Sequence, residues 1–297
     1  MGESYGTNPG EEKITMPLSS YKKVRDIIKK YGTGYYRATF LFPREIRHAT
    51  WIYYTFVRLP DEIVDGTSAT DRTAKLATWI DKWNTYLEHR GSTDVEVFRS
   101  FAEVIDEYAI PAEYTTSFLG VMQQDLGVTR YETYRDLEDY MYGSAVVVGY
   151  TMSHIIGFKD GALPYAKALG EAFQMTNFLR DIREDYEERG RIYIPREDME
   201  RFGVTERHIA EHCTDDAWRA LMKFEIDRTR ALYEKGVAGI PLLDPRGRRA
   251  VYAAALIYRE VLNTIEDRKY DIFTGRVVVS PLRKTMLLLQ ALWKRKL

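Results

Sequence analysis

The chain has 297 residues, of which 45% are hydrophobic and 29% charged, as in an ordinary folded protein rather than a disordered one. Its 43 Lys and Arg residues nearly balance 44 Asp and Glu residues at a net charge of −1, so no long-range field attracts nucleic acid and no nucleic-acid partner is expected. The single cysteine, Cys213, excludes an internal disulfide and favours a cytoplasmic location.

Residues 1–14 are polar, have no apolar core of a signal peptide, and are predicted to form a flexible tail. From about Ser19 onward, apolar residues recur at helical spacing between breaks that contain glycine or proline. No internal repeat or linker divides this stretch, and no apolar run approaches the roughly 20 residues of a membrane span. We therefore predict a single all-α domain over residues 15–297.

The first informative segment ends at Asp65. Asp61 and Asp65 are four residues apart, so on a helix they share one face, about 6 Å apart along the axis. Tyr54 and Arg58 extend the same face toward the N-terminus. The neighbouring residues are apolar, which indicates a buried face where two carboxylates need a cation between them. Pro60 predicts a kink or a helix restart just before Asp61.

A second segment carries Gln174, Asn177, Asp181 and Asp185, at spacings that place them within a narrow wedge of one helix face. All four supply oxygen and none supplies sulfur or imidazole, a donor set that suits Mg²⁺, with Mn²⁺ as an alternative, better than zinc or copper. Arg180 lies close by, and a metal site edged by arginine suits a diphosphate.

Either acidic pair alone is also the pattern of a solvated helix surface. The two pairs lie about 120 residues apart and are each embedded in apolar sequence. Together they predict two helices that face each other across a bundle and hold one polynuclear Mg²⁺ site, as bundle interiors commonly do.

In these segments the sequence resembles the squalene/phytoene synthase family, the head-to-head trans-isoprenyl diphosphate synthases. The similarity follows a consistent order along most of the chain and is carried by residues 58–65, 131–145, 174–195, 258–262 and 270–274. The resemblance implies an all-α isoprenoid-synthase helical bundle with a central hydrophobic cavity. It also implies that two aspartate-rich helices bind Mg²⁺ and the diphosphates of two prenyl substrates.

The resemblance further implies roles for individual residues. The implied catalytic residues are Arg58, Asp61, Asp65, Asp181 and Asp185. The implied metal ligands are Asp61, Glu62, Asp65, Asn177, Asp181 and Asp185, with Glu62 standing where many members have aspartate. The implied diphosphate contacts are Tyr31, Tyr54, Arg58, Gln174, Asn177, Arg180, Arg191, Tyr258 and Arg259.

The chain departs from part of the family at Gly143, where some members have a tyrosine that has been proposed to act in the chemistry. Either Tyr140 or Tyr142 takes the place of that tyrosine here, or the role is dispensable.

The family chemistry implies two successive ionisations. The first couples two prenyl chains into a cyclopropylcarbinyl diphosphate, and the second rearranges it. Proton loss then gives phytoene from C20 chains or dehydrosqualene from C15 chains, whereas hydride capture from NADPH gives squalene.

The local sequence at residues 58–65, 141–145 and 189–195 looks more like that of bacterial-type phytoene synthases than that of squalene synthases. No nicotinamide-binding glycine motif is present. We therefore predict a prenyltransferase of carotenoid biosynthesis that makes phytoene from two geranylgeranyl diphosphates without NADPH. The alternative is a dehydrosqualene or squalene synthase that acts on farnesyl diphosphate.

Two other classes compete with this interpretation. His208 and His212 match a metalloprotease pattern next to Cys213, and on a helix the two histidines would share a face, although no third zinc ligand is obvious. A non-catalytic prenyl-lipid-binding protein is the second alternative, but lipid binding alone does not need four acids on two buried faces.

The C-terminal segment carries an apolar stripe among basic residues. The stripe consists of Leu282, Met286, Leu289, Trp293 and Leu297. It predicts either a last helix docked on the core or an interfacial helix that contacts an anionic membrane surface. The sequence carries no signal of an oligomeric state.

Overall fold

The computed structural model describes residues 25–29, 33–66, 69–91 and 93–294. Within these residues every regular element is helical, and the one isolated β-bridge joins Phe158 to Leu243. The predicted all-α class is therefore confirmed. The predicted tail over residues 1–14 lies outside the described residues.

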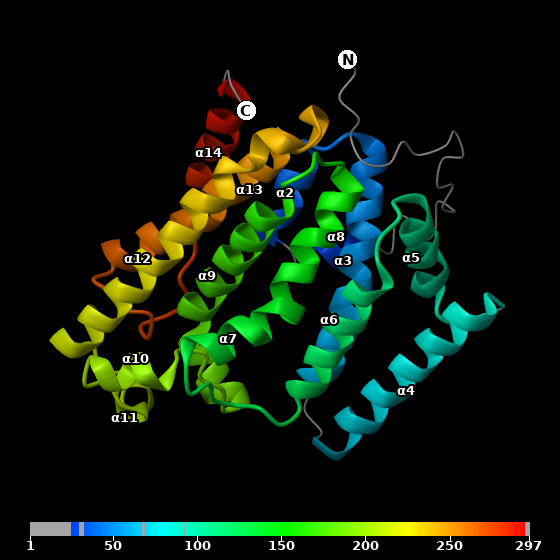
Figure 1. Cartoon of the computed structure of the whole chain (residues 1–297). Helices are drawn as coiled ribbons and strands as arrows, with labels where there is room; N and C mark the ends of the chain where they lie inside the picture. The colour runs from blue at the N-terminus through cyan, green and yellow to red at the C-terminus, as the bar shows by residue number, and fades with distance from the viewer. Residues whose placement is uncertain (1–24, 30–32, 67–68, 92, 295–297) are drawn as a thin grey trace.

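The helices are arranged as a bundle (Figure 1). In chain order they are α2 (Thr33–Thr39), α3 (Arg44–Val64), α4 (Ala69–His89), α5 (Glu96–Glu107), α6 (Ala112–Gln124), α7 (Tyr134–Met141), the π-helical turn η1 (Tyr142–Val146), α8 (Val147–Ile156), α9 (Leu163–Arg189), α10 (Arg196–Arg201), α11 (Glu206–Ala210), α12 (Asp216–Ala238), the 3₁₀ turn η2 (Ile240–Leu242), α13 (Pro245–Asp267) and α14 (Pro281–Trp293).

The long helix α9 lies between α8 and α12 and belongs to two separate hydrophobic clusters. Its Met175 and Phe178 pack with residues of α3 to α8, whereas Leu179 and Ile182 pack with α12 and α13. Gly170 permits the close approach of α9 to η1, because a Cβ at this position would lie 2.8 Å from the carbonyl oxygen of Ala145. Helix α9 therefore joins two cores.

Aromatic side chains hold the first cluster together. The ring of Phe56 on α3 lies 4.6 Å from that of Trp83 on α4 and 4.2 Å from that of Phe101 on α5, centroid to centroid. All three side chains are at most 1% exposed. Rings of this size supply much of the apolar area of a core, so this cluster fixes α4 and α5 against α3.

Helix α3 runs unbroken through Pro60, so the predicted restart before Asp61 does not occur, and the alternative of a kink stays a prediction. Proline removes one N–H donor, but Pro60 is buried near the end of a helix that is already anchored in the core by residues such as Ile52 and Phe56. The next turn is intact, since the Asp65 N–H donates to the carbonyl oxygen of Asp61 over 2.9 Å. Both carboxylates consequently stay on one continuous helix.

Helix α14 docks on the bundle through Leu287 and Ala291, and the predicted apolar stripe faces away from it. The described stripe residues are 51–83% exposed, namely Leu282, Met286, Leu289 and Trp293. The face of α14 that packs on the core is therefore opposite the apolar stripe. Leu297 lies outside the described residues.

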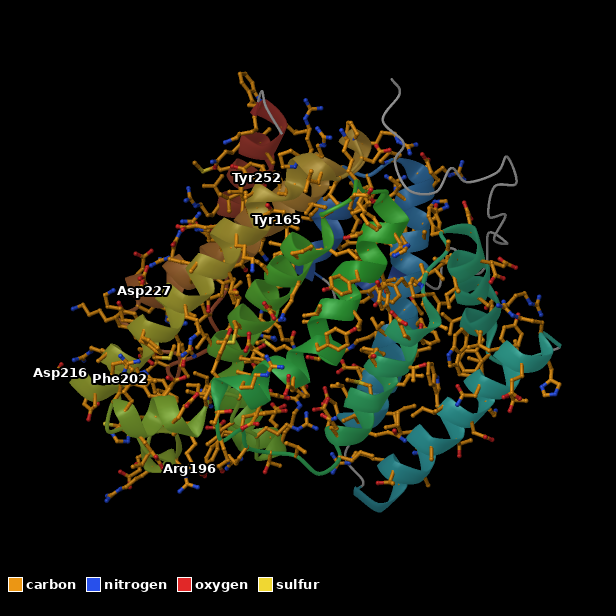
Figure 2. All side chains as sticks on the ribbon, viewed as in Figure 1. Tyr165, Arg196, Phe202, Asp216, Asp227 and Tyr252 are labelled. Carbon is orange, nitrogen blue, oxygen red and sulfur yellow. The ribbon has the colours of Figure 1, made fainter. Side chains whose placement is uncertain are left out.

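None of the helices in the described parts of the chain combines the length and apolarity needed to cross a membrane. Figure 2 shows Asp216, Asp227 and Arg196 at the edge of the molecule.

Candidate active site

A cavity of about 1040 Å³ lies between the two hydrophobic clusters. Helices α3 and α9 both end in the lower part of the view in Figure 1, and carboxylates of their last turns line the cavity. We call this part of the cavity the acidic end, and its aspartates are Asp61, Asp65, Asp125, Asp181 and Asp185. The rest of the wall is largely apolar and includes Phe42, Met152, Ile156, Leu169, Phe173, Ile240 and Val251. The cavity therefore suits a molecule with a long hydrocarbon body, and its acidic end suits a cation.

On α3, Arg58 is held by two acids of its own helix. Its guanidinium donates to the carboxylates of Asp61 and Glu62, one helical turn further on. Arg58, Asp61 and Tyr54 line the cavity, as the sequence predicted for site residues. The Glu62 carboxylate instead accepts from Arg58, and Glu62 is absent from the cavity wall.

On α9, the predicted stripe Gln174, Asn177, Asp181 and Asp185 lines the same cavity from the opposite side. The Arg180 Nε donates to Oδ1 of Asp181 over 2.7 Å. The periodicity of the sequence thus placed all four stripe residues correctly. The two acidic pairs do face one another across the bundle.

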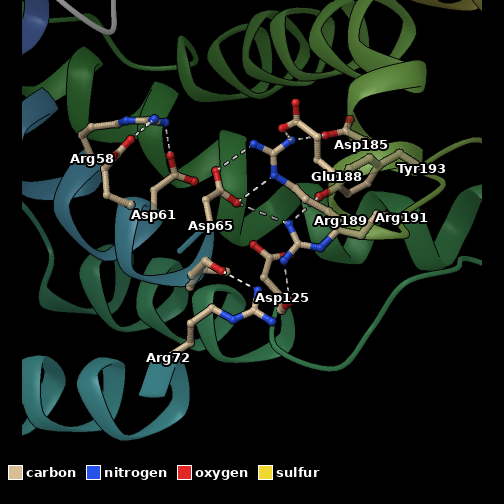
Figure 3. Close-up of polar contacts among 12 residues, drawn as sticks. Arg58, Asp61, Asp65, Arg72, Asp125, Asp185, Glu188, Arg189, Arg191 and Tyr193 are labelled. Carbon is tan, nitrogen blue, oxygen red and sulfur yellow. Dashed lines mark hydrogen bonds and ion pairs between the residues drawn. The ribbon is translucent and has the colours of Figure 1, made fainter. Parts of the chain in front are cut away.

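Arg189 bridges the two acidic helices (Figure 3). Its Nε and Nη2 donate to the two carboxylate oxygens of Asp65 over 3.0 and 3.3 Å, and its Nη1 donates to Oδ1 of Asp185 over 3.3 Å. Arg191 lies beside it, with Nη1 3.9 Å from Asp65. A bidentate arginine–carboxylate pair fixes orientation as well as charge, so these contacts set the spacing of α3 and α9 at the acidic end.

Asp125 is a site residue that the sequence analysis missed. It follows α6, is 8% exposed and lines the cavity. Its Oδ2 accepts from the hydroxyl of Tyr140 over 3.2 Å, its Oδ1 is buried without a hydrogen bond, and its carbonyl oxygen accepts from Arg191 over 2.5 Å. Asp125 continues the buried stripe of Phe118 and Met122 at helical spacing, and an acid in an apolar stripe is a signal that would have found it.

Enclosure changes the acidity of these groups. Burial raises the pKa of Asp185 to about 7, with Asp181 adding to the shift, and burial raises the pKa of Asp125 to about 6. Burial and the charge of Asp65 likewise raise the pKa of Asp61 to about 7. These carboxyl groups ionise with difficulty because they are buried close together. A divalent cation between them would stabilise their ionised forms, and hard oxygen donors suit Mg²⁺.

Basic groups stand beside the acids in the cavity wall. Lys284 of α14 lines the cavity, and burial together with the charges of Arg37 and Arg180 lowers its pKa. Arg276 also lines the cavity, 3.6 Å from Glu184. Cations gathered in this way fit an anion between them, so this group extends the predicted diphosphate contacts.

The structure distinguishes Tyr140 from Tyr142. Tyr140 is 5% exposed and lines the cavity, whereas Tyr142 is 42% exposed and lies outside the cavity wall. Gly143 itself has no room for a side chain, because a Cβ there would lie 2.2 Å from Cγ2 of Val121 and 2.7 Å from the carbonyl oxygen of Ser117. Of the two candidates, only Tyr140 reaches the cavity.

The remaining predicted diphosphate contacts differ in whether they reach the cavity. Tyr258 lines the cavity, and its ring lies 4.8 Å from that of Phe173. Arg259 is exposed and lines a separate pocket between α12 and α13, so the structure does not bring it to the cavity. Arg191 lines the cavity, and Tyr31 lies outside the described residues.

The zinc pattern does not form a helical motif. Helix α11 ends at Ala210, and His212 has a left-handed φ of 56°, so the prediction that the two histidines share a helix face is wrong. The side chains of His208, Cys213 and Asp215 do lie near one another. However, Nδ1 of His208 accepts from the N–H of Thr205 over 3.0 Å. The proton of a neutral ring then sits on Nε2, toward Asp215, where a metal would bind.

Comparisons with known proteins agree with this geometry. The model of the squalene/phytoene synthase family matches residues 28–283. The 15-cis-phytoene synthase of Synechocystis sp. is 34% identical over 97% of the chain and 88% of its own length, and that of Synechococcus elongatus is 33% identical over 89% and 90%.

Solved structures show the same architecture. A dehydrosqualene synthase crystallised with a ligand superimposes with a TM-score of 0.84 at 30% identity, covering 93% of this chain and 98% of that one. A squalene synthase from Alicyclobacillus acidocaldarius gives a TM-score of 0.77 at 26% identity, covering 86% and 97%. The cavity described above therefore lies in a fold shared with enzymes that join prenyl chains.

Proposed function

Since the chain belongs to the squalene/phytoene synthase family, we propose that it is a phytoene synthase, which joins two geranylgeranyl diphosphates head to head and releases two diphosphates. The observation that carries the proposal is one cavity with aspartates from two facing helices at one end and an apolar wall over the rest. Phytoene synthases among the relatives match the chain over nearly its whole length.

Mg²⁺, held by Asp61, Asp65, Asp181, Asp185 and Asn177, would supply charge neutralisation for the departing diphosphate. Arg58, Arg180 and Lys284 bind and orient the diphosphate oxygens from the neighbouring wall. Because these cations are fixed before the bond breaks, they stabilise negative charge as it develops on the leaving group.

The apolar part of the cavity holds the hydrocarbon chains and excludes water from the cationic carbon skeleton. Aromatic faces of Tyr53, Phe173 and Phe178 line this part and can stabilise a carbocation. The first step joins the two chains as a cyclopropylcarbinyl diphosphate with loss of one diphosphate and one proton. The second step loses the other diphosphate and one proton, which gives phytoene without a reductant.

We further propose that the exposed stripe of α14 contacts an anionic membrane surface. Leu282 and Trp293 are 72% and 83% exposed, Arg283 lies on the helix, and Lys294 follows its last residue. Val278, just before the helix, is 60% exposed and also lines the cavity, so the stripe adjoins the cavity wall. Prenyl diphosphates and a C40 hydrocarbon partition into lipid, which gives such a contact a purpose.

The decisive experiment is incubation of the purified protein with Mg²⁺ and either geranylgeranyl or farnesyl diphosphate, with and without NADPH, followed by product identification. We expect phytoene from the C20 substrate at a rate that NADPH leaves unchanged. Preferred formation of a C30 hydrocarbon from farnesyl diphosphate would identify a dehydrosqualene synthase, and an NADPH-dependent reduced product would identify a squalene synthase.

A further inference from the structure

The guanidinium of Arg189 forms hydrogen bonds with acids of the predicted metal site. Its three hydrogen bonds, from Nε, Nη1 and Nη2, all end on carboxylate oxygens of Asp65 and Asp185. Its one further ion pair is with Glu188, 3.7 Å away. Figure 3 shows the side chain lying between the two aspartates. A divalent cation bound by Asp65 and Asp185 uses the same oxygens.

Arg191, two residues further on, is held differently. It donates to the carbonyl oxygen of Asp125 and to the hydroxyl of Tyr193 over 3.5 Å, and its side chain is 8% exposed. Neither partner is a predicted metal ligand. Arg191 therefore keeps its hydrogen bonds whether or not the carboxylates of α3 and α9 coordinate a metal.

Arg189 also has room to move. It is the last residue of α9, its side chain is 26% exposed, and it lies in the cavity wall. The next residue, Gly190, adopts a left-handed conformation with φ 64° and has no atom within 4 Å of the position of a Cβ. The Arg189 side chain can therefore turn from the carboxylates toward the cavity without displacing the core.

We infer that Arg189 is an exchange residue: a divalent cation displaces its guanidinium from Asp65 and Asp185, and the guanidinium then binds the substrate diphosphate. This inference rests on the proposed function. A guanidinium and a divalent cation that compete for the same carboxylate oxygens repel each other. A displaced guanidinium loses all its hydrogen-bond partners, and a diphosphate accepts the same bidentate contact that the carboxylate gave.

The exchange couples the two ligands. A metal ion that binds alone separates Arg189 from Asp65 and Asp185, and the guanidinium gains no new partner. A metal ion that binds together with diphosphate also displaces the guanidinium, but the diphosphate then becomes its new partner. Each ligand therefore raises the affinity for the other through Arg189, in addition to their direct contact.

The test measures Mn²⁺ binding by electron paramagnetic resonance, with and without inorganic pyrophosphate, for the wild type, Arg189→Gln and Arg207→Gln. Arg207 forms an exposed pair with Glu211 on α11, 2.7 Å away, so its variant removes the same charge outside the cavity. Without pyrophosphate, we expect Arg189→Gln to bind Mn²⁺ at least about fivefold more tightly than the wild type. Pyrophosphate should strengthen Mn²⁺ binding less in Arg189→Gln than in the other two proteins.

Equal Mn²⁺ affinities in Arg189→Gln and the wild type, or an equal effect of pyrophosphate, would overturn the inference while leaving phytoene formation untouched. Absence of Mn²⁺ binding by the wild type, even with pyrophosphate, would overturn it together with the proposed metal site. If Arg189→Gln loses its helical circular dichroism, Arg189→Lys carries the test. It keeps the charge but not the bidentate geometry, and its Mn²⁺ affinity without pyrophosphate should exceed that of the wild type.

Discussion

The hydroxyl of Tyr140 donates a hydrogen bond to Oδ2 of Asp125 over 3.2 Å, and both side chains are more than nine-tenths buried. Tyr140 packs against Tyr131 and Tyr193, with ring centroids 5.2 and 5.7 Å away. The pair thus fastens α7 to the end of α6 in the wall of the cavity.

The first prediction follows from this pair. Tyr140→Phe should lower the free energy of unfolding by about 1–3 kcal/mol, because it leaves both oxygens of a buried carboxylate without a donor. The double variant with Asp125→Asn should lose less than the sum of the two single variants. Urea denaturation of the four proteins measures the coupling, and additive losses would show that the hydrogen bond contributes nothing.

The second prediction concerns the metal ligands. Asp61→Asn and Asp181→Asn should each reduce kcat by about a hundredfold or more, because each replaces a charged ligand by a neutral one of similar size. Helical circular dichroism should remain nearly unchanged, and EDTA should stop the wild-type reaction until Mg²⁺ is added. Near-normal turnover by either variant would disprove a metal site shared by the two helices.

The third prediction concerns pH. Asp185, with its pKa raised to about 7, binds a proton in the folded state that it has lost in the unfolded chain, where carboxyls titrate near 4. The folded state therefore binds more protons between about pH 4 and 7, and stability falls as pH rises through that range. In EDTA, Tm should decline from pH 5 to pH 8, less steeply for Asp185→Asn than for the wild type.

Added Mg²⁺ should reverse this trend, because a cation stabilises the ionised carboxylates. We expect Mg²⁺ to raise Tm more at pH 8 than at pH 5. An equal Tm increase at both values, or a pH slope in Asp185→Asn that matches the wild type, would contradict the raised pKa of this group.

The fourth prediction concerns α14. The double variant Leu282→Gln and Trp293→Gln should reduce binding to vesicles that contain anionic lipid about tenfold or more, since it removes two large apolar side chains from the exposed stripe. Tm should stay unchanged because neither side chain packs in the core. Val128→Gln, another exposed apolar site, is the matched control. Vesicle flotation identical in all three proteins would remove α14 as the membrane contact.

The fifth prediction concerns Gly143. Gly143→Ala should lower the free energy of unfolding by about 1–3 kcal/mol, since its Cβ would collide with Val121 and with the backbone at Ser117. Adding Val121→Ala should restore only part of the loss, because the carbonyl oxygen of Ser117 remains 2.7 Å from the Cβ position. Full stability of Gly143→Ala alone would contradict this packing.

Helical periodicity predicted the part of the site that depends on one helix at a time. Asp61 and Asp65 share a face, as do the α9 residues from Gln174 to Asp185, because 3.6 residues per turn determines their direction once each helix forms. Pro60 does not restart the helix, because packing against the core outweighs the loss of one backbone donor.

The residues that the sequence did not place correctly depend on contacts between distant segments of the chain or on local turns. Arg189 continues the ligand stripe four residues after Asp185, but its bond to Asp65 joins positions 124 residues apart. Arg259 was placed beside Tyr258 by resemblance, yet adjacent helical residues point about 100° apart, and only Tyr258 meets the cavity. His212 lost its helical position to a left-handed turn that no spacing rule anticipates.

The position of the cavity between two hydrophobic clusters has a mechanical consequence. The aromatic cluster around Phe56 and the cluster around Trp218 each bury their own side chains, and helices α9 and α13 contribute to both. A local opening of the boundary between the two clusters would let a bulky chain enter the cavity without exposing either core. We therefore expect the boundary between the clusters, rather than either cluster, to open when a long hydrocarbon enters or leaves.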